Sequence, residues 1–129
     1  IDNIPFALAR VYPTTIDRIN ISQAANLAAT RALKRLSLSG WVLLDGGLKL
    51  NNNQPYQSII KGDEKYDSIA LASIIAKVHR DKIMTNHHRL YYQYGFDRHK
   101  GYGTQIHLAA LKKFGPCPIH RRSFLTKLT

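Results

Sequence analysis

Residues Lys61–Asp81 read KGDEKYDSIALASIIAKVHRD, and this stretch does more than any other to decide the fold. Its apolar residues recur at helical spacing, which predicts an amphipathic helix from about Asp67 to at least Met84. The residues expected on its buried side are Ile69, Ala72, Ile75 and Ala76. Just before this helix stands Asp63, which we expect to be a buried carboxylate at the end of a strand.

Two short segments upstream of this stretch have the pattern of strands. Trp41–Leu44 is a continuous apolar run, which is typical of a strand covered on both faces in α/β proteins. Tyr56–Ile60 is the second, and a polar turn at residues 51–55 separates the two. Phe6–Tyr12, which is stopped by Pro13, is predicted to be a further strand.

Helices are predicted on both sides of these strands. Ser22–Leu36 is rich in alanine and amphipathic, with Ser22 as its N-cap and a face of small residues that can pack closely against a sheet. Ile106–Phe114 is a short helix ended by Gly115 and Pro116. The pattern predicts an α/β fold, and 129 residues suffice for one domain but not for two with separate cores.

The composition bounds the class of protein and its partners. A hydrophobic content of 44% argues against disorder, and a formal net charge of +11 favours a polyanionic partner such as a nucleic acid. A basic protein without such a partner is the alternative. No run approaches the length of a membrane span, and the single cysteine, Cys117, fits a structural role in a reducing compartment, so we expect a cytoplasmic protein without a membrane partner.

Asp45 and Asp63 are the candidate metal ligands. Each follows a predicted strand, and in open α/β sheets ligands bind where strands end. Two carboxylates there could share divalent ions, as phosphoryl-transfer sites do. The alternatives are that Asp45 only starts a turn and that Asp63 only interacts with a helix dipole.

Three residues of the predicted long helix could contact a phosphate backbone. Ser73, Lys77 and Arg80 stand at i, i+4 and i+7, so they share one helical face. Read alone, this is more often a solvated face, with Lys77 paired to Asp81.

The loop His99–Thr104 reads HKGYGT and places Tyr102 between two glycines, where its ring could stack on a sugar or base. An aromatic turn is the alternative. The histidines at positions 87, 88, 99, 107 and 120 have no convincing metal-ligand spacing, and most are expected at the surface or in the core.

Taken in order, these motifs resemble the ribonuclease HII family over nearly the whole chain. The upstream pairs Ile16-Asp17 and Asn20-Ile21 are also similar to that family. The other segments that carry the resemblance are Asp45-Gly46, Lys61–Asp81, His99–Thr104, His107 and Gly115–Phe124, which reads GPCPIHRRSF.

The resemblance implies a ribonuclease-H-like mixed sheet flanked by helices, and an endonuclease that uses Mg²⁺ or Mn²⁺. Its implied substrates are the RNA strand of RNA/DNA hybrids and single ribonucleotides embedded in duplex DNA, cleaved to 3′-hydroxyl and 5′-phosphate ends. It makes Asp45 and Asp63 the third and fourth of four catalytic carboxylates and Tyr102 the residue that stacks on deoxyribose. It also favours Ser73, Lys77 and Arg80 as phosphate contacts.

One part of the family pattern has no match in residues 1–129. The family's first strand carries an Asp-Glu pair and a Gly-Arg-Gly segment that senses the ribose 2′-hydroxyl. Since the chain also opens at Ile1 and its only methionine is Met84, we expect residues 1–129 to be a single partial domain, with only the later strands and the C-terminal helical region. We expect this piece alone to be inactive. The rivals are a non-catalytic, basic nucleic-acid-binding module and a piece that cannot fold without its missing strands.

Overall fold

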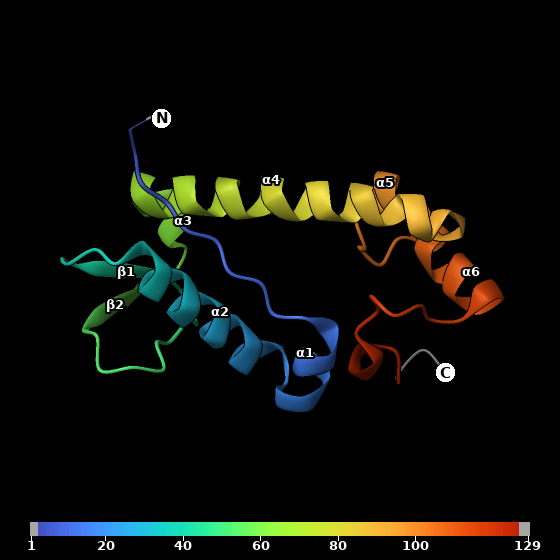
Figure 1. The fold of residues 1–129 in the computed structure, drawn as a ribbon, viewed down its shortest axis with the longest axis horizontal. Coiled ribbons are helices and arrows are strands. Elements are labelled where there is room, and N and C mark those ends of the chain that lie inside the picture. Colours follow the sequence, from blue (N-terminus) through green and yellow to red (C-terminus); the bar gives the residue numbers. More distant parts are fainter. Residues whose placement is uncertain (1–2, 127–129) are drawn as a thin grey trace. The chain divides into compact units, whose positions relative to one another are not determined.

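The computed structural model describes residues 3–126, which form two compact units, one of residues 3–73 with 121–126 and one of residues 74–120 (Figure 1). The single-domain expectation therefore stays a prediction, and each unit is described by itself. The helices and strands, in chain order, are α1 (Pro13–Ile19), α2 (Ile21–Leu36), β1 (Val42–Asp45), β2 (Tyr56–Ile59), α3 (Gly62–Lys65), α4 (Asp67–Leu90), the 3₁₀ turn η1 (Tyr92–Tyr94), α5 (Phe96–His99), α6 (Gln105–Phe114) and the 3₁₀ turn η2 (Arg122–Phe124).

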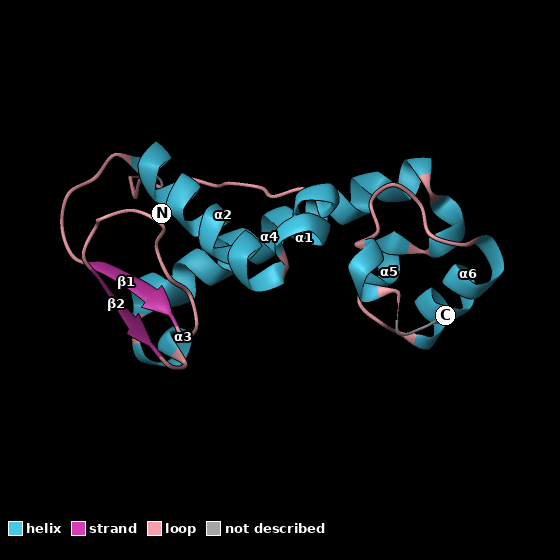
Figure 2. Ribbon diagram, turned by 90° about the horizontal axis from the view of Figure 1, so that it is seen from below, coloured by secondary structure: helices cyan, strands magenta, loops and turns pink. Residues whose placement is uncertain are grey.

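The first unit contains a sheet of two parallel strands, β1 and β2, which lie side by side in Figure 2. Val42 pairs with Tyr56 and Asp45 with Ile59, so both strands end at the same edge. The α/β class and both of these strands are confirmed. The expectation that β1 is covered on both faces is wrong, because only Leu44 of its four residues is buried and β2 is its only neighbour within residues 3–126.

The predicted strand Phe6–Tyr12 is also wrong. These residues are irregular, since no strand in the described part of the chain pairs with them. Pro13 occupies the first turn of α1, where its fixed φ and missing N–H are tolerated.

α2 confirms the predicted alanine-rich helix but begins one residue earlier. Its N-cap is Asn20 rather than Ser22, and the Asn20 side chain accepts a hydrogen bond from the Gln23 amide at 3.0 Å. Asn20 has a φ of 70°, which asparagine adopts more readily than most residues. Within the helix Ala24 is 2% exposed and Asn26 5% exposed.

α4 confirms the predicted long helix and extends it to Leu90. Its expected buried side is only partly right, because Ile69 is buried and Ile75 half-buried whereas Ala72 and Ala76 are exposed. Helical periodicity fixes which residues share a face, but it does not fix whether another element covers that face.

The second unit is built around Tyr94, Phe96, Ala110 and Cys117. α6 confirms the predicted helix, with Thr104 as its N-cap and Gly115 at its C-terminal end. Burial raises the pKa of the Cys117 thiol, which suits the expected structural role. Within residues 3–126, no helix is long and apolar enough to cross a membrane.

Candidate active site

Asp45 is the last residue of β1, and its carboxylate is fixed by two backbone amides. Its Oδ1 atom accepts hydrogen bonds from the amides of Gly46 and Gly62, each at 2.9 Å. The second bond joins the end of β1 to the start of α3, seventeen positions along the chain. The half-buried Asp45 side chain is therefore held at the edge where both strands end.

Gly62 brings the backbone that carries Asp63 close to Asp45. A Cβ added at Gly62 would lie 2.6 Å from Cδ1 of Ile69 and 3.5 Å from Oδ1 of Asp45, so a side chain there would clash with the apolar start of α4. Any larger residue would therefore have to displace the buried Ile69 side chain. No local pattern around Lys61 and Asp63 indicates this role of Gly62.

Asp63 lies in the first turn of α3 and is exposed, so the expectation of a buried carboxylate is wrong. The physical reason is that α3 is a single turn at the surface of the unit, and only Gly62 of its four residues is buried. Apolar residues around Asp63 in the sequence predicted burial, but they belong to β2 and α4.

The two carboxylates fit part of a site for a hard divalent cation. Within residues 3–126 neither Oδ2 of Asp45 nor the Asp63 carboxylate has a hydrogen-bond donor, which leaves these oxygens available. Carboxylate oxygen is the donor that Mg²⁺ and Mn²⁺ prefer. In the same residues, no group of three or more His, Cys, Asp or Glu side chains is placed to hold a metal, so a metal site that includes Asp45 and Asp63 would need further donors.

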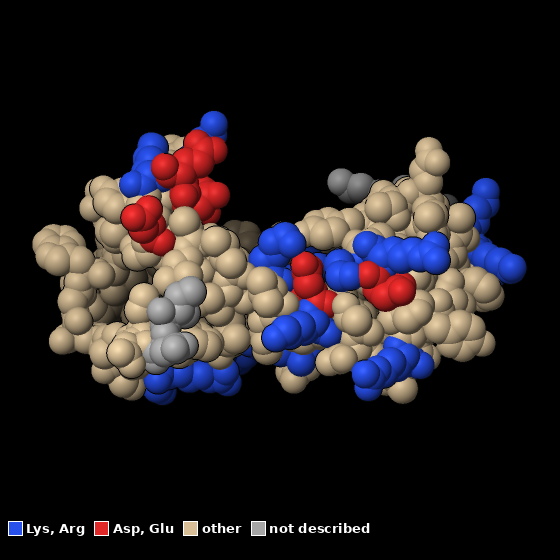
Figure 3. Space-filling view, turned by 90° about the horizontal axis from the view of Figure 1, so that it is seen from above, with Lys and Arg blue, Asp and Glu red and all other residues tan. Residues whose placement is uncertain are grey.

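Lys77 and Arg80 are engaged within the second unit. Lys77 Nζ lies 2.9 Å from Oδ2 of Asp81, and this hydrogen bond raises the pKa of Lys77 and lowers that of Asp81. Red carboxylate groups flanked by blue lysine and arginine groups are visible in Figure 3. The intrahelical pair predicted as the alternative therefore exists. A phosphate contact would require Lys77, whose side chain is 67% exposed, to exchange Asp81 for the phosphate.

Arg80 links α4 to the loop that carries Tyr102. One guanidinium nitrogen donates to the carbonyl of Lys100 at 2.7 Å, and Cζ lies 5.3 Å from the centroid of the Tyr102 ring. Tyr102 is 58% exposed, so its ring is accessible for stacking. The sequence did not predict that these two residues meet. Ser73, the third residue of the predicted face, is exposed in the first unit.

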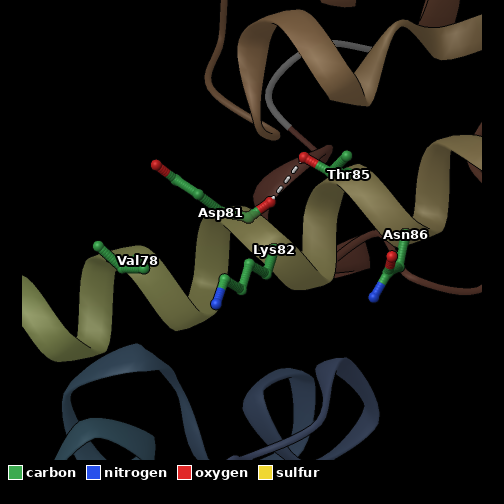
Figure 4. A pocket seen from close by; sticks show the side chains of 5 residues that line it. All are labelled: Val78, Asp81, Lys82, Thr85 and Asn86. Atoms are coloured by element: carbon green, nitrogen blue, oxygen red, sulfur yellow. Dashed lines mark hydrogen bonds between the residues drawn. The ribbon is translucent and has the colours of Figure 1, made fainter.

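A surface hollow elsewhere on α4 contains none of the predicted site residues. It is lined by Val78, Asp81, Lys82, Thr85 and Asn86 (Figure 4). The Thr85 hydroxyl donates to the carbonyl of Asp81 at 2.9 Å, a contact within one helix.

Three histidines that the sequence reasoning set aside form a buried cluster beside the Tyr102 loop. His99, His107 and His120 are 7%, 5% and 9% exposed, so the expectation of core histidines is confirmed for them. The rings of His99 and His107 are stacked with centroids 4.2 Å apart, and Nε2 of His107 lies 3.0 Å from Nε2 of His120. The spacing of these three histidines along the sequence did not predict that their rings form a cluster.

Comparison with known proteins gives consistent similarities. The sequence model of the family described as Ribonuclease HII matches residues 5–127. A protein named Ribonuclease HII from Chlamydia pneumoniae is 48% identical over 92% of this chain and 56% of its own length. One of the same name from Caldicellulosiruptor saccharolyticus is 44% identical over 98% of this chain and 62% of its own length. The chain therefore spans a little over half the length of these relatives.

Proposed function

Because the chain belongs to the ribonuclease HII family, we propose that it supplies part of the active site of an endonuclease acting on RNA/DNA hybrids and on duplex DNA with embedded ribonucleotides. Cleavage would leave 3′-hydroxyl and 5′-phosphate ends. The observation that supports this best is the contact between Asp45 and the Gly62 amide, which brings two acidic segments to one edge of the sheet.

In this proposal Asp45 and Asp63 hold Mg²⁺ or Mn²⁺ together with the Asp-Glu pair that the family carries on its first strand. The bound ions supply stabilisation of developing charge and a water activated for in-line attack. The amides of Gly46 and Gly62 orient the Asp45 carboxylate, so the carboxylate needs little rearrangement when substrate binds.

The second unit supplies substrate contacts in this proposal. The exposed Tyr102 ring stacks on a sugar, while Lys77 and Arg80 contact phosphates with Ser73 from the same helix. The family's Gly-Arg-Gly segment, which has no match in residues 1–129, would supply the main contact to the ribose 2′-hydroxyl.

The first experiment measures cleavage of a DNA duplex that contains one ribonucleotide, with Mg²⁺ and with Mn²⁺. The 129-residue chain is assayed alone and mixed with a segment carrying the Asp-Glu and Gly-Arg-Gly motifs. We expect cleavage only in the mixture, because residues 1–129 supply only two of the four carboxylates. Robust cleavage by the chain alone would contradict the proposed division of ligands. Absence of cleavage, with association of the two pieces demonstrated, would contradict the proposed activity.

A non-catalytic nucleic-acid-binding module is the second proposal, supported by the net charge of +11. Binding that needs no divalent ion and does not distinguish a hybrid from a DNA duplex would favour it. Binding that prefers a duplex with a ribonucleotide and tightens with Mg²⁺ would favour the endonuclease.

A further inference from the structure

Two buried histidine side chains, those of His99 and His107, form hydrogen bonds with the backbone of the loop that carries Tyr102. Nδ1 of His107 lies 2.9 Å from the Tyr102 carbonyl, and Nδ1 of His99 accepts from the Gly101 amide at 3.0 Å. The Tyr102 amide donates to the His99 carbonyl at 2.9 Å. The Tyr102 carbonyl also accepts from the Thr104 amide at 2.8 Å, so the histidines fix the backbone on both sides of the exposed ring together with this turn.

The hydrogen bonds determine where each proton of the His107–His120 pair lies. The Cys117 amide can only donate, so Nδ1 of His120, at 2.9 Å, accepts and the neutral ring carries its proton on Nε2. The Tyr102 carbonyl can only accept, so His107 carries its proton on Nδ1 and its Nε2 is an acceptor. Nε2–H of His120 therefore donates to Nε2 of His107. The hydrogen bond to the Tyr102 carbonyl and the one from the Cys117 amide both require this direction.

An additional proton on His107 would disrupt this series of hydrogen bonds. If His107 became doubly protonated and kept its bond to His120, His120 would need its proton on Nδ1, which would then oppose the Cys117 N–H. Burial lowers the pKa of His107, which favours its neutral form. Titratable groups of the described residues that contact the pair include His99 of α5, Tyr94 of η1 and Cys117.

A cation of α4 also contacts this loop: Arg80 donates to the Lys100 carbonyl and lies against the Tyr102 ring. Arg80 contacts the loop from α4, whereas His99 and His107 contact the loop backbone through their buried rings.

We propose that His107 and His120 are positioning residues for Tyr102, which hold its backbone through a one-directional chain of hydrogen bonds between neutral imidazoles. The proposal rests on the function proposed above for Tyr102. The histidines touch no substrate; they fix the place and direction of the ring that does.

The test uses two substitutions of His107 in the full-length protein. The amide nitrogen of asparagine can take the place of Nδ1 and still donate to the Tyr102 carbonyl, whereas that of glutamine takes the place of Nε2 and cannot. We expect His107→Gln to raise KM about two- to tenfold, the range for one lost hydrogen bond, with little change in kcat. His107→Asn, which keeps the donor to Tyr102 but loses the acceptor for His120, should raise KM clearly less than His107→Gln. His79→Gln is the matched control, because His79 makes no hydrogen bond to other described residues through its side chain.

The effect must also depend on Tyr102. In a Tyr102→Ala background, His107→Gln should add little to KM, because the ring that it positions is gone. Equal values for His107→Gln and His107→Asn, or the same loss with and without Tyr102, would overturn the proposal. If His107→Gln does not fold, His120→Asn takes its place. It keeps an acceptor for the Cys117 amide but loses the donor to His107, and it too should raise KM only when Tyr102 is present.

A measurement without substrate separates this proposal from the proposed function. Nitrogen-15 NMR of the imidazoles should show the proton of His107 on Nδ1 and that of His120 on Nε2 at pH 7. The Tyr102 amide should shift in His107→Gln more than in His107→Asn. The opposite tautomers would overturn the positioning role even if the enzyme is active. The expected tautomers in a protein without nuclease activity would contradict only the proposed function.

Discussion

At the scale of single residues, Asp45 has two separable properties, its shape and its charge. The shape of the Asp45 carboxylate serves the fold, since Oδ1 accepts hydrogen bonds from the amides of Gly46 and Gly62. The charge has no cationic partner within residues 3–126, because neither ion pair recorded there includes Asp45. The charge is therefore available to an external cation through Oδ2.

The substitution Asp45→Asn separates these properties. The asparagine oxygen can still accept from both amides, so we expect the fold to be retained while turnover of a ribonucleotide-containing duplex falls by more than about 100-fold through lost metal binding. Duplex binding should survive. Cleavage assays and circular dichroism check both, and unchanged turnover would remove Asp45 from the site.

Asp63→Asn should cause a comparable loss of turnover, and Glu64→Gln is its matched control. Both side chains are exposed in the same turn of α3. If Asp63 is a metal ligand, only its substitution should shift the Mg²⁺ dependence of cleavage. Equal effects of the two substitutions would mean that the turn needs negative charge rather than a specific ligand.

At the scale of elements, α2 depends on a cap that the sequence reasoning placed two residues too late. Asn20 both supplies the side-chain acceptor and adopts a φ of 70°. Alanine can do neither, whereas glycine tolerates the conformation. We expect Asn20→Ala to lower the free energy of unfolding by about 1–2 kcal/mol and Asn20→Gly by clearly less. Urea denaturation of the full-length protein distinguishes them, and equal losses would show that the backbone conformation is unimportant.

On α4, the proposed phosphate contact of Lys77 competes with its bond to Asp81. Lys77→Gln should weaken binding to any duplex and reduce the slope of log K against log salt by about 0.9, the value for one phosphate contact. Lys82→Gln is the control at an exposed lysine on the same helix. Equal slopes for wild type and Lys77→Gln, measured by fluorescence anisotropy, would exclude the contact.

The sequence predicted the helices and the two paired strands well because their signals are local. The apolar run before Asp45 and the helical spacing after Asp67 needed no knowledge of the rest of the molecule. Burial of Asp63, Ala72 and Ala76 was predicted wrongly, since burial depends on what covers a face. The contact between Arg80 and Tyr102 was missed for the same reason, because nothing local brings α4 to that loop.

At the scale of the whole molecule, the C-terminal segment returns to the first unit through Asp17. Its carboxylate accepts hydrogen bonds from the Ser123 amide at 2.9 Å, the Ser123 hydroxyl at 2.7 Å and the Arg122 amide at 3.0 Å. The hydrogen bonds that Asp17 accepts from Ser123 hold the pKa of Asp17 below its ordinary value, and the bond from the Ser123 amide contributes most. These hydrogen bonds join α1 to η2.

This contact should weaken in acid. A carboxyl group whose pKa is lower in the folded state stabilises that state above its ordinary pKa, near 3.9, and loses this contribution as the pH falls through the lowered value. We expect the Ser123 amide resonance to titrate with the lowered pKa of Asp17. In Asp17→Asn this titration should be absent, and an unshifted midpoint in the wild type would contradict the contact.

The contact between Asp17 and Ser123 also has a consequence for biosynthesis. Since residues 74–120 form the second unit, the first unit is interrupted in sequence and receives its last piece only after the whole second unit has been made. At translation rates of about 5–20 residues per second, that delay is on the order of several seconds. During this time Asp17 cannot make its contact with Ser123, which has not yet been synthesised. The order of synthesis thus makes the contact between Asp17 and Ser123, which are 106 positions apart, a late one in the first unit.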